Sequence, residues 1–404
     1  MKKLFSFSLV ALLLIVFTGG GFVFYRLAKF RSAVSELKAD RQPVSLLDLA
    51  VPIPIDGPNS SIHLRRLATP LKSFEEEMFA VGNEVLSEPV DDEVIAKFHE
   101  IEKAYPDVFP LIDKVIADYT IEIDVTGEFD EDLTNYLEDC QLLRSCARVM
   151  SWEMRILEAE GKPDEAVEVG LEILKLTRLF DAYPTIVAQL VRVACRGIAI
   201  QAIHDVIIEH PVSDEIREKL NVELALLDGV SDYRHSLVTE RAVGIESVSE
   251  QNMFQIAMNG VGYLDYVASQ IENADKEGFE RDLSFEEDFS YIVDGLLTGG
   301  IIPALQQTRH AIDRLRSWVR ALRIINGLTA NPEKAKVVQD GATKEALAAL
   351  GIPEVMMVDT VTGELMKVTR KGDAWVVYSV GADKVDDGGS HDQVKDYVLG
   401  GEEE

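Results

Sequence analysis

The sequence predicts a mainly α-helical protein: an irregular helical bundle or array with a small C-terminal antiparallel β-unit and an N-terminal transmembrane helix. Three observations support this: a long uncharged stretch near the start, apolar residues with a helical period between residues 71 and 350, and short strand-like runs after residue 352. The expected organisation is an anchor at 1–31, a juxtamembrane connector at 32–70, a helical domain at 71–350, a β-unit at 351–400 and a disordered acidic tail at 401–404.

The N-terminal segment has the length and charge pattern of an uncleaved anchor. Lys2 and Lys3 precede an uncharged stretch from Leu4 to Tyr25. As a helix this stretch rises about 33 Å, enough for a hydrocarbon core of about 30 Å. A cleaved signal peptide usually has a shorter apolar core and an A-x-A-like site, so an anchor is favoured. Because long domains that follow such an anchor are commonly exported, we expect a single-pass protein of a bacterial inner membrane with its bulk on the periplasmic side.

From residue 71 the apolar residues follow a helical period. We expect helices over 71–88, 91–105, 106–119, 131–161, 163–183, 184–210, 213–229, 231–257, 261–274, 284–297, 303–326 and 333–350. The helix at 184–210 is apolar on nearly all sides, which predicts the central, most buried member. Within the connector at 32–70, residues 41–61 hold four prolines. The connector is therefore expected to be extended rather than helical.

One helix pair resembles a tetratricopeptide unit. The stretch AEGKPDEAVEVGLEIL places Gly161, Ala166 and Gly170 at small-residue contact positions, where two helices approach closely. No second copy follows at the period of that family, so the resemblance implies helical packing and not a repeat array.

A basic stretch within 303–326 carries Arg309, Arg316, Arg320 and Arg323 away from an apolar stripe. One interpretation is a membrane-surface helix whose arginines meet anionic lipid. The favoured interpretation is a bundle helix whose arginines pair with the acidic residues that dominate the rest of the chain.

After residue 352 the pattern changes to strands. The runs EVMMVD, ELMKVTR and AWVVYSV at 354–359, 364–370 and 374–380 are separated by turn residues. Two or three strands of this length are marginal alone, so we expect them to pack on the helices or on a partner.

An acidic, glycine-rich loop follows these strands, and two interpretations of it stay open. Residues 358–396 contain a Thr-Gly turn, two strand-like runs, a Tyr-Ser-Val-Gly-x-Asp step and then the acidic loop. This segment resembles the C-terminal segment of type II secretion major pseudopilins, in which such a loop binds calcium. The resemblance implies Ca²⁺ ligands at Asp383, Asp386 and Asp387, with Asp392 or Asp396 as further candidates. The alternative is a solvated turn whose acids keep a sheet edge from aggregating. The prepilin cleavage pattern is absent, so the resemblance does not imply pilus assembly.

A wider resemblance covers the helical region. Within 133–245 the chain is similar to uncharacterised bacterial envelope proteins with a single N-terminal anchor, which often end in the same Tyr-Ser-Val-Gly-x-Asp segment. The resemblance implies the same architecture for this chain, and the family has no assigned activity to carry over.

The charge composition of the chain indicates which classes of molecule it is expected to bind. Lys and Arg number 40 against 70 Asp and Glu, giving a formal net charge of −30, so nucleic acid is not an expected partner. The surface suits cationic partners or divalent ions. Cys140, Cys146 and Cys195 lie in helical, partly apolar patterns and are expected to be buried free thiols.

No His-Glu-x-x-His, P-loop, Rossmann or Gly-x-Ser-x-Gly motif occurs in the sequence. We therefore expect no catalytic residue from motif evidence, and three hypotheses follow. The first is a membrane-anchored envelope scaffold or interaction module with an unidentified protein partner and a structural calcium site. The second is a hydrolase assembled from separated helical residues near His235, for which Glu240 and Arg241 are neighbours in the same helix. The third is a component of a secretion-like assembly.

Overall fold

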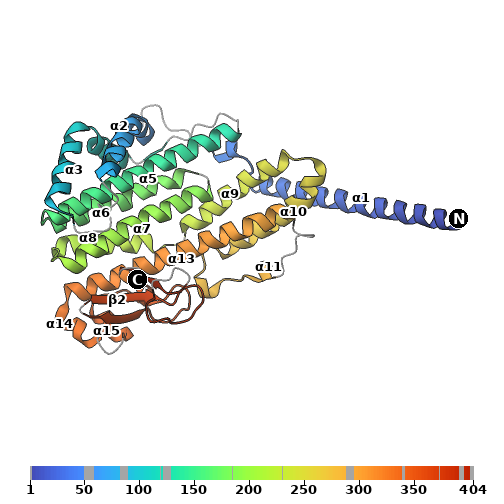
Figure 1. Cartoon of the computed structure of the whole chain (residues 1–404). Helices are drawn as coiled ribbons and strands as arrows, with labels where there is room; N and C mark the ends of the chain where they lie inside the picture. Colours follow the sequence, from blue (N-terminus) through green and yellow to red (C-terminus); the bar gives the residue numbers. More distant parts are fainter. Residues whose placement is uncertain are drawn as a thin grey trace.

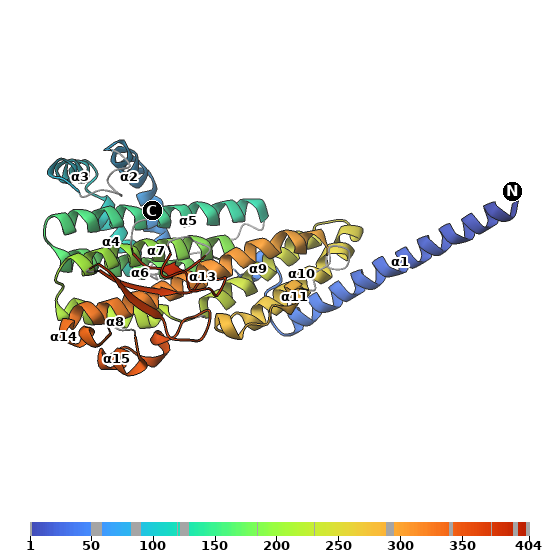
Figure 2. The same cartoon turned by 60° about the horizontal axis from the view of Figure 1, so that its bottom comes forward.

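The computed structural model describes residues 2–49, 59–81, 90–118, 120–121, 129–183, 185–229, 231–287, 295–338, 342–372, 374–390 and 395–400. The protein is mainly helical with a small three-stranded antiparallel sheet near the C-terminus, as the sequence predicts. The helices form an elongated body, and the first helix projects from one end of it (Figures 1 and 2).

The first part of the body consists of the helices between residues 2 and 227. Their bounds are α1 Lys2–Ala39, α2 Ser60–Val81, α3 Asp92–Ala104, α4 Val108–Asp118, α5 Phe129–Ala159, α6 Pro163–Leu176, α7 Ile186–Glu209 and α8 Asp214–Leu227. The second part comprises α9 Ser231–Ser249, α10 Met253–Asn273, α11 Ser284–Glu287, α13 Leu296–Ala330, α14 Pro332–Ala335 and α15 Lys344–Ala349.

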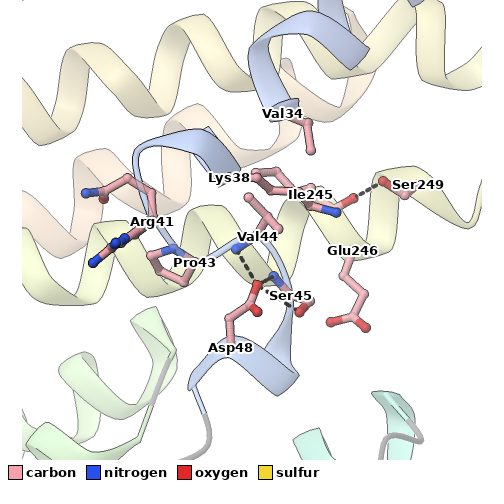
Figure 3. Close-up of a pocket in the computed structure, with 11 residues that line it drawn as sticks. Val34, Lys38, Arg41, Pro43, Val44, Ser45, Asp48, Ile245, Glu246 and Ser249 are labelled. Carbon is pink, nitrogen blue, oxygen red and sulfur yellow. Dashed lines mark hydrogen bonds between the residues drawn. The ribbon is translucent and has the colours of Figure 1, made fainter. Parts of the chain in front are cut away.

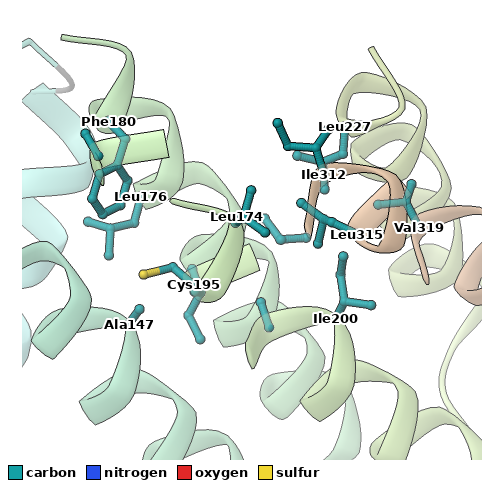
Figure 4. Close-up of a cluster of buried hydrophobic side chains, with 14 of the residues drawn as sticks. Ala147, Leu174, Leu176, Phe180, Cys195, Ile200, Leu227, Ile312, Leu315 and Val319 are labelled. Carbon is teal, nitrogen blue, oxygen red and sulfur yellow. The ribbon is translucent and has the colours of Figure 1, made fainter. Parts of the chain in front are cut away.

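Helix α7 occupies the centre of the body, as its all-round apolar pattern predicts. It packs against α5, α6, α9 and α13. Figure 4 shows part of this core, which includes Ala147 of α5, Leu174 of α6, Cys195 and Ile200 of α7 and Val319 of α13. Among the described residues, α7 alone has the length and apolar composition of a membrane span, and 61% of that window is buried inside the body. It is therefore a core helix. The side chains of residues 1–19 lie outside the described set, so this observation does not bear on the predicted anchor.

The predicted thiols are in the core. Cys140, Cys146 and Cys195 are all free and buried. Burial raises the pKa of Cys140 and Cys195 to about 12, so both are protonated and unreactive at neutral pH.

The helix pair that resembles a tetratricopeptide joint is α5 and α6. A Cβ atom at Gly170 would lie 2.6 Å from Ile203 Cγ1 and 2.9 Å from Met154 Cε, so the glycine permits close packing of three helices. Ala166 is fully buried as well. Gly161 acts differently from the prediction: it has no atom near its would-be Cβ, and its φ of +75° makes the turn between the helices.

The predicted connector is shorter than 32–70, because helices occupy both of its ends. Helix α1 continues to Ala39, and α2 begins at Ser60 and contains Pro70. Leu64, Leu67 and Leu71 of α2 are fully buried at helical spacing, and this packing outweighs the backbone hydrogen bond that Pro70 removes.

A second boundary differs at the end of α9. The sequence pattern predicts one helix over 231–257, but the chain breaks before Met253. The Asn252 side chain accepts hydrogen bonds from the backbone N–H groups of Phe254 and Gln255. The side-chain oxygen of Gln255 in turn accepts one from the backbone N–H of Asn252. This capping box starts a new helix although the apolar pattern runs on through it.

The C-terminal sheet has the order β1-β2-β3, with β1 Lys367–Lys371, β2 Ala374–Ser379 and β3 Tyr397–Val398. Lys367 faces Tyr378 in the first pair and Tyr378 faces Val398 in the second. Strands β2 and β3 pack on α13, so the expectation that the sheet lies on the helices is confirmed. The short strand β3 was not predicted.

The first predicted strand is wrong over most of its length. Glu354–Met357 form a 3₁₀ turn after Pro353, and only Val358 makes a β-bridge, to Leu365. The carboxylate of Asp359 accepts hydrogen bonds from the backbone N–H groups of Val361 and Val380 and from the Ser379 hydroxyl. Because these groups bind Asp359, the chain turns here instead of continuing a ladder.

Candidate functional sites

Four arginines of α13 are buried: Arg309, Arg316, Arg320 and Arg323. Arg320 donates to Asp228 at 2.8 Å and to Glu277 at 3.0 Å, and Arg316 donates to the same Glu277 oxygen at 2.8 Å. Burial opposes ionisation of Glu277, but the two guanidinium groups outweigh it and hold the pKa of Glu277 below its usual value. Arg320 and Arg316 thus join α13 to the end of α8 and to the segment after α10.

Two further pairs extend this network. Arg281 forms a bidentate pair with Asp313 of α13 at 2.6 and 2.8 Å, and both side chains are buried. Arg309 donates to Glu286 at 2.9 and 3.1 Å. The interpretation of this stretch as a bundle helix whose arginines pair with acids is confirmed for Arg309, Arg316 and Arg320, whereas Arg323 donates to the carbonyl oxygen of Gly351. Because these arginines are buried, the membrane-surface interpretation is wrong.

In the acidic loop after β2, aspartates predicted to bind calcium instead contact the loop backbone and the adjacent strands. Asp383 accepts a hydrogen bond from the N–H of Val385 at 3.0 Å. Asp386 accepts one from the Tyr378 hydroxyl at 2.9 Å and lies 3.4 Å from Lys367 Nζ. Burial opposes this charge, but the Tyr378 hydroxyl, the backbone N–H of Gly388 and Lys367 together hold the pKa of Asp386 below its usual value. Asp387 is exposed.

Asp396 is the carboxylate that organises the loop. It is buried, and it accepts hydrogen bonds from the backbone N–H groups of Gly389 at 2.7 Å, Ser390 at 3.0 Å and Asp387 at 3.4 Å. Gly381 completes the arrangement, because a Cβ atom there would lie 1.5 Å from the carbonyl oxygen of Lys395. The buried carboxylate of Asp396 therefore satisfies the backbone N–H donors of the loop and holds the loop in place.

The three predicted calcium ligands are not brought to one centre. Among the described residues, Asp383, Asp386 and Asp387 do not form a group whose ligand atoms all lie within 4.8 Å of one another. Asp392 lies outside the described residues. Calcium binding stays a prediction, and calorimetric titration of the full chain tests it. Saturable heat that Asp383→Ala and Asp387→Ala remove would support calcium binding, and no saturable heat in the parent would eliminate it.

One mixed cluster was not predicted. Ligand atoms of Glu158, Glu209 and His210 lie within 4.8 Å of one another, and the His210 ring is 3.4 Å from Glu158. Burial raises the pKa of Glu158, and the nearby His210 opposes that rise. Sequence spacing missed it because Glu158 comes from α5 and the other two from the end of α7. His204 does not join it: its ring is buried against Gly400 and bonds to Asp205.

The residues of the hydrolase hypothesis do not converge. His235 is exposed on α9. Glu240 accepts a hydrogen bond from the backbone N–H of Ile186 at 3.0 Å, at the start of α7. Arg241 donates to Gln42 at 3.2 Å, so Glu240 and Arg241 both serve contacts between separate elements.

Several surface hollows are lined partly by charged residues, and two of them bear on the path and partners of the chain. Figure 3 shows a pocket of about 680 Å³ where the end of α1 and the following segment meet α9. Asp48 accepts hydrogen bonds from the N–H groups of Val44 and Ser45, and Glu246 accepts one from Leu46 at 2.7 Å. These bonds fix the path of the chain after α1.

The other hollow is a groove of about 720 Å³ between α6 and α8. Its acidic residues outnumber its two lysines: Glu168, Glu172, Glu215, Glu218 and Glu223 against Lys175 and Lys219. Val222 lies in the groove and is 55% exposed, and Leu226, one turn along α8, is 64% exposed. The groove therefore offers apolar surface within an acidic rim.

No family model, curated protein or solved structure matches this chain. The resemblances to pseudopilins, to tetratricopeptide units and to envelope proteins accordingly remain predictions from the sequence.

Proposed function

We propose that this protein is a non-catalytic, membrane-tethered scaffold whose helical body binds other proteins. The observation that carries the proposal is the division of α1 into two parts. Residues 26–39 belong to the body, whereas the part before them projects from it (Figures 1 and 2). The projecting part contains the uncharged stretch from Leu4 to Tyr25, which has the length of a membrane span.

The inner part of α1 is firmly packed against α10. Leu27 and Phe30 are each 4% exposed, and a Cβ atom at Gly260 would lie 2.5 Å from the Phe30 ring. Arg26 Nε donates to the carbonyl oxygen of Ala257 at 2.8 Å. A tether built in this way holds the body in a fixed orientation, which suits a scaffold.

The groove between α6 and α8 is the candidate partner surface. Its apolar residues Leu171 and Val222 lie beside an excess of carboxylates, which fits a basic amphipathic segment of another protein. The hydrolase alternative has less support because the residues near His235 serve helix contacts.

The alternative of a secretion-like assembly also has less support. Addition of a like strand needs an open sheet edge, and β1 is an edge strand. It carries Lys367, Arg370 and Lys371. Basic side chains on an edge strand oppose pairing with a second copy.

Membrane fractionation of the full chain tests the tether. We expect the parent to remain with membranes after an alkaline carbonate wash. Replacing Leu13 and Leu14 by arginine places two charges in the uncharged stretch and should release the protein, because each charge opposes insertion by about 2.5–3.5 kcal/mol. Release of the parent protein by the wash would contradict the proposal. Leu226→Arg, on α8, is the matched control and should leave retention unchanged.

A further inference from the structure

An exposed apolar surface surrounds the place where α1 leaves the body. On α1, Phe22, Phe24 and Tyr25 are 46%, 70% and 67% exposed. On α10, Met253 and Phe254 are each 61% exposed. We call these five residues the collar. Large apolar side chains at adjoining positions on two helices form a patch of the kind that marks an interaction surface.

The two halves of the collar lie at the same level along the body. Arg26 contacts Ala257, and Phe30 contacts Gly260. Residue numbers therefore increase in the same direction along both helices, so α1 and α10 run parallel. Phe22 lies one helical turn before Arg26, and Met253 lies one turn before Ala257. Helix α10 accordingly begins beside the base of the projecting part of α1 (Figures 1 and 2).

The order of residues along α1 matches the profile of a bilayer surface. The uncharged stretch ends with the aromatic residues of the collar, and the exposed Lys29 and Arg31 follow within two turns, whereas Arg26 is buried against α10. Aromatic side chains gather at the boundary between hydrocarbon and headgroups, and basic side chains reach the headgroups. Lys29 also pairs with Asp265 at 3.2 Å, which links α1 to α10 beyond the collar.

We propose that the collar is a lipid-binding surface, so that the helical body sits directly on the bilayer with Met253 and Phe254 immersed in its interface. This inference rests on the proposed membrane tether. It adds that the body has no flexible spacer from the membrane, because the connector predicted to follow the anchor begins only after α1 has packed on α10. A second copy of the chain is the competing occupant of the collar.

Depth measurement on the full chain tests the proposal. Met253→Cys is labelled with a polarity-sensitive fluorophore, and Leu226→Cys is the control, because Leu226 is equally exposed at 64% and lies on α8, away from α1. The native thiols are buried and should not react. The labelled chains are reconstituted into vesicles of phosphatidylethanolamine and phosphatidylglycerol.

We expect nitroxide lipids to quench the label at residue 253 several-fold more than the control label, and iodide to quench it several-fold less. Equal access of iodide to both labels on vesicle-bound protein would overturn the collar and leave the tether intact. Protection from iodide without quenching by nitroxide lipids would assign the collar to a second copy and overturn lipid binding. Failure of the parent to float with vesicles would overturn the tether and the collar together.

Discussion

Two carboxylates of the loop after β2 have different roles, which depend on what surrounds them. Asp396 is buried among three backbone N–H donors, whereas Asp383 is exposed and caps a single turn. A buried acceptor that satisfies several donors cannot be weakened without leaving those donors poorly paired. The loop after β2 therefore depends on Asp396 more than on the aspartates that the sequence makes conspicuous.

We expect Asp396→Asn to destabilise the protein by about 1–3 kcal/mol, because the amide has one acceptor oxygen for donors that now share a carboxylate. Denaturant unfolding measures the change. Asp383→Asn is the control and should have an effect within about 0.5 kcal/mol. Equal effects of the two substitutions would show that Asp396 does not organise the loop.

We expect titration of Glu153, on α5, to make the stability of the folded protein depend on pH. Burial, together with the charges of Glu102 and Asp113, raises its pKa to about 7. The folded protein thus holds a proton that the unfolded chain loses near its ordinary pKa of 4.5. Stability from this residue is present at low pH and is lost as pH rises from 4.5 through about 7.

Glu153→Gln removes that titration. At about pH 8 the variant should be more stable than the parent by about 1–3 kcal/mol, and at about pH 4.5 the two should be nearly equal. Thermal unfolding at both pH values measures this difference. A constant difference between the two proteins across the pH range would contradict the assignment.

At the scale of elements, α13 connects most of the molecule. Its apolar stripe packs on α7, α8 and α10, and its arginines bind acids from α8 and from the segments after α10. A buried ion pair adds little stability compared with a well-packed apolar core, but removal of one partner leaves an uncompensated buried charge. The network therefore fixes which segments lie beside α13.

Arg320→Met should reduce the free energy of unfolding by about 3–5 kcal/mol, because Asp228 and Glu277 lose a buried partner. Arg314→Met on the same helix is the control. Arg314 is half-buried and lies over the Trp318 ring, so its loss should amount to about 1 kcal/mol or less. Denaturant unfolding of both variants tests this, and similar losses would show that the network is not decisive.

At the scale of the whole molecule, the packing of α1 against α10 fixes how the body is oriented relative to α1, and hence relative to the membrane tether that we propose. A helix that ended at residue 31 and passed into an extended connector would leave the body free to turn. Continuation of α1 to Ala39 over Gly260 of α10 removes that freedom. The orientation of the groove between α6 and α8 is set by the same contact.

Gly260→Ala should destabilise the protein by about 1–3 kcal/mol and loosen α1, because the new methyl group meets the Phe30 ring. Gly197→Ala on α7 is the matched control, since its Cβ would make an ordinary 3.5 Å contact with Trp318. Hydrogen exchange of residues 26–39 measures the loosening. Unchanged exchange in Gly260→Ala would contradict the close packing.

The sequence by itself determined the helical class, the central place of α7, the buried thiols and the pairing of the α13 arginines. Each of these follows from the periodicity of one segment or from the acidic charge balance of the whole chain, and both can be read without knowing which segments meet. The tertiary structure decided the rest: the role of Asp396, the break at Asn252, the length of α1 and the cluster at His210. These depend on groups distant in sequence, such as the Gly260 surface that receives Phe30, and no local pattern specifies where those groups meet.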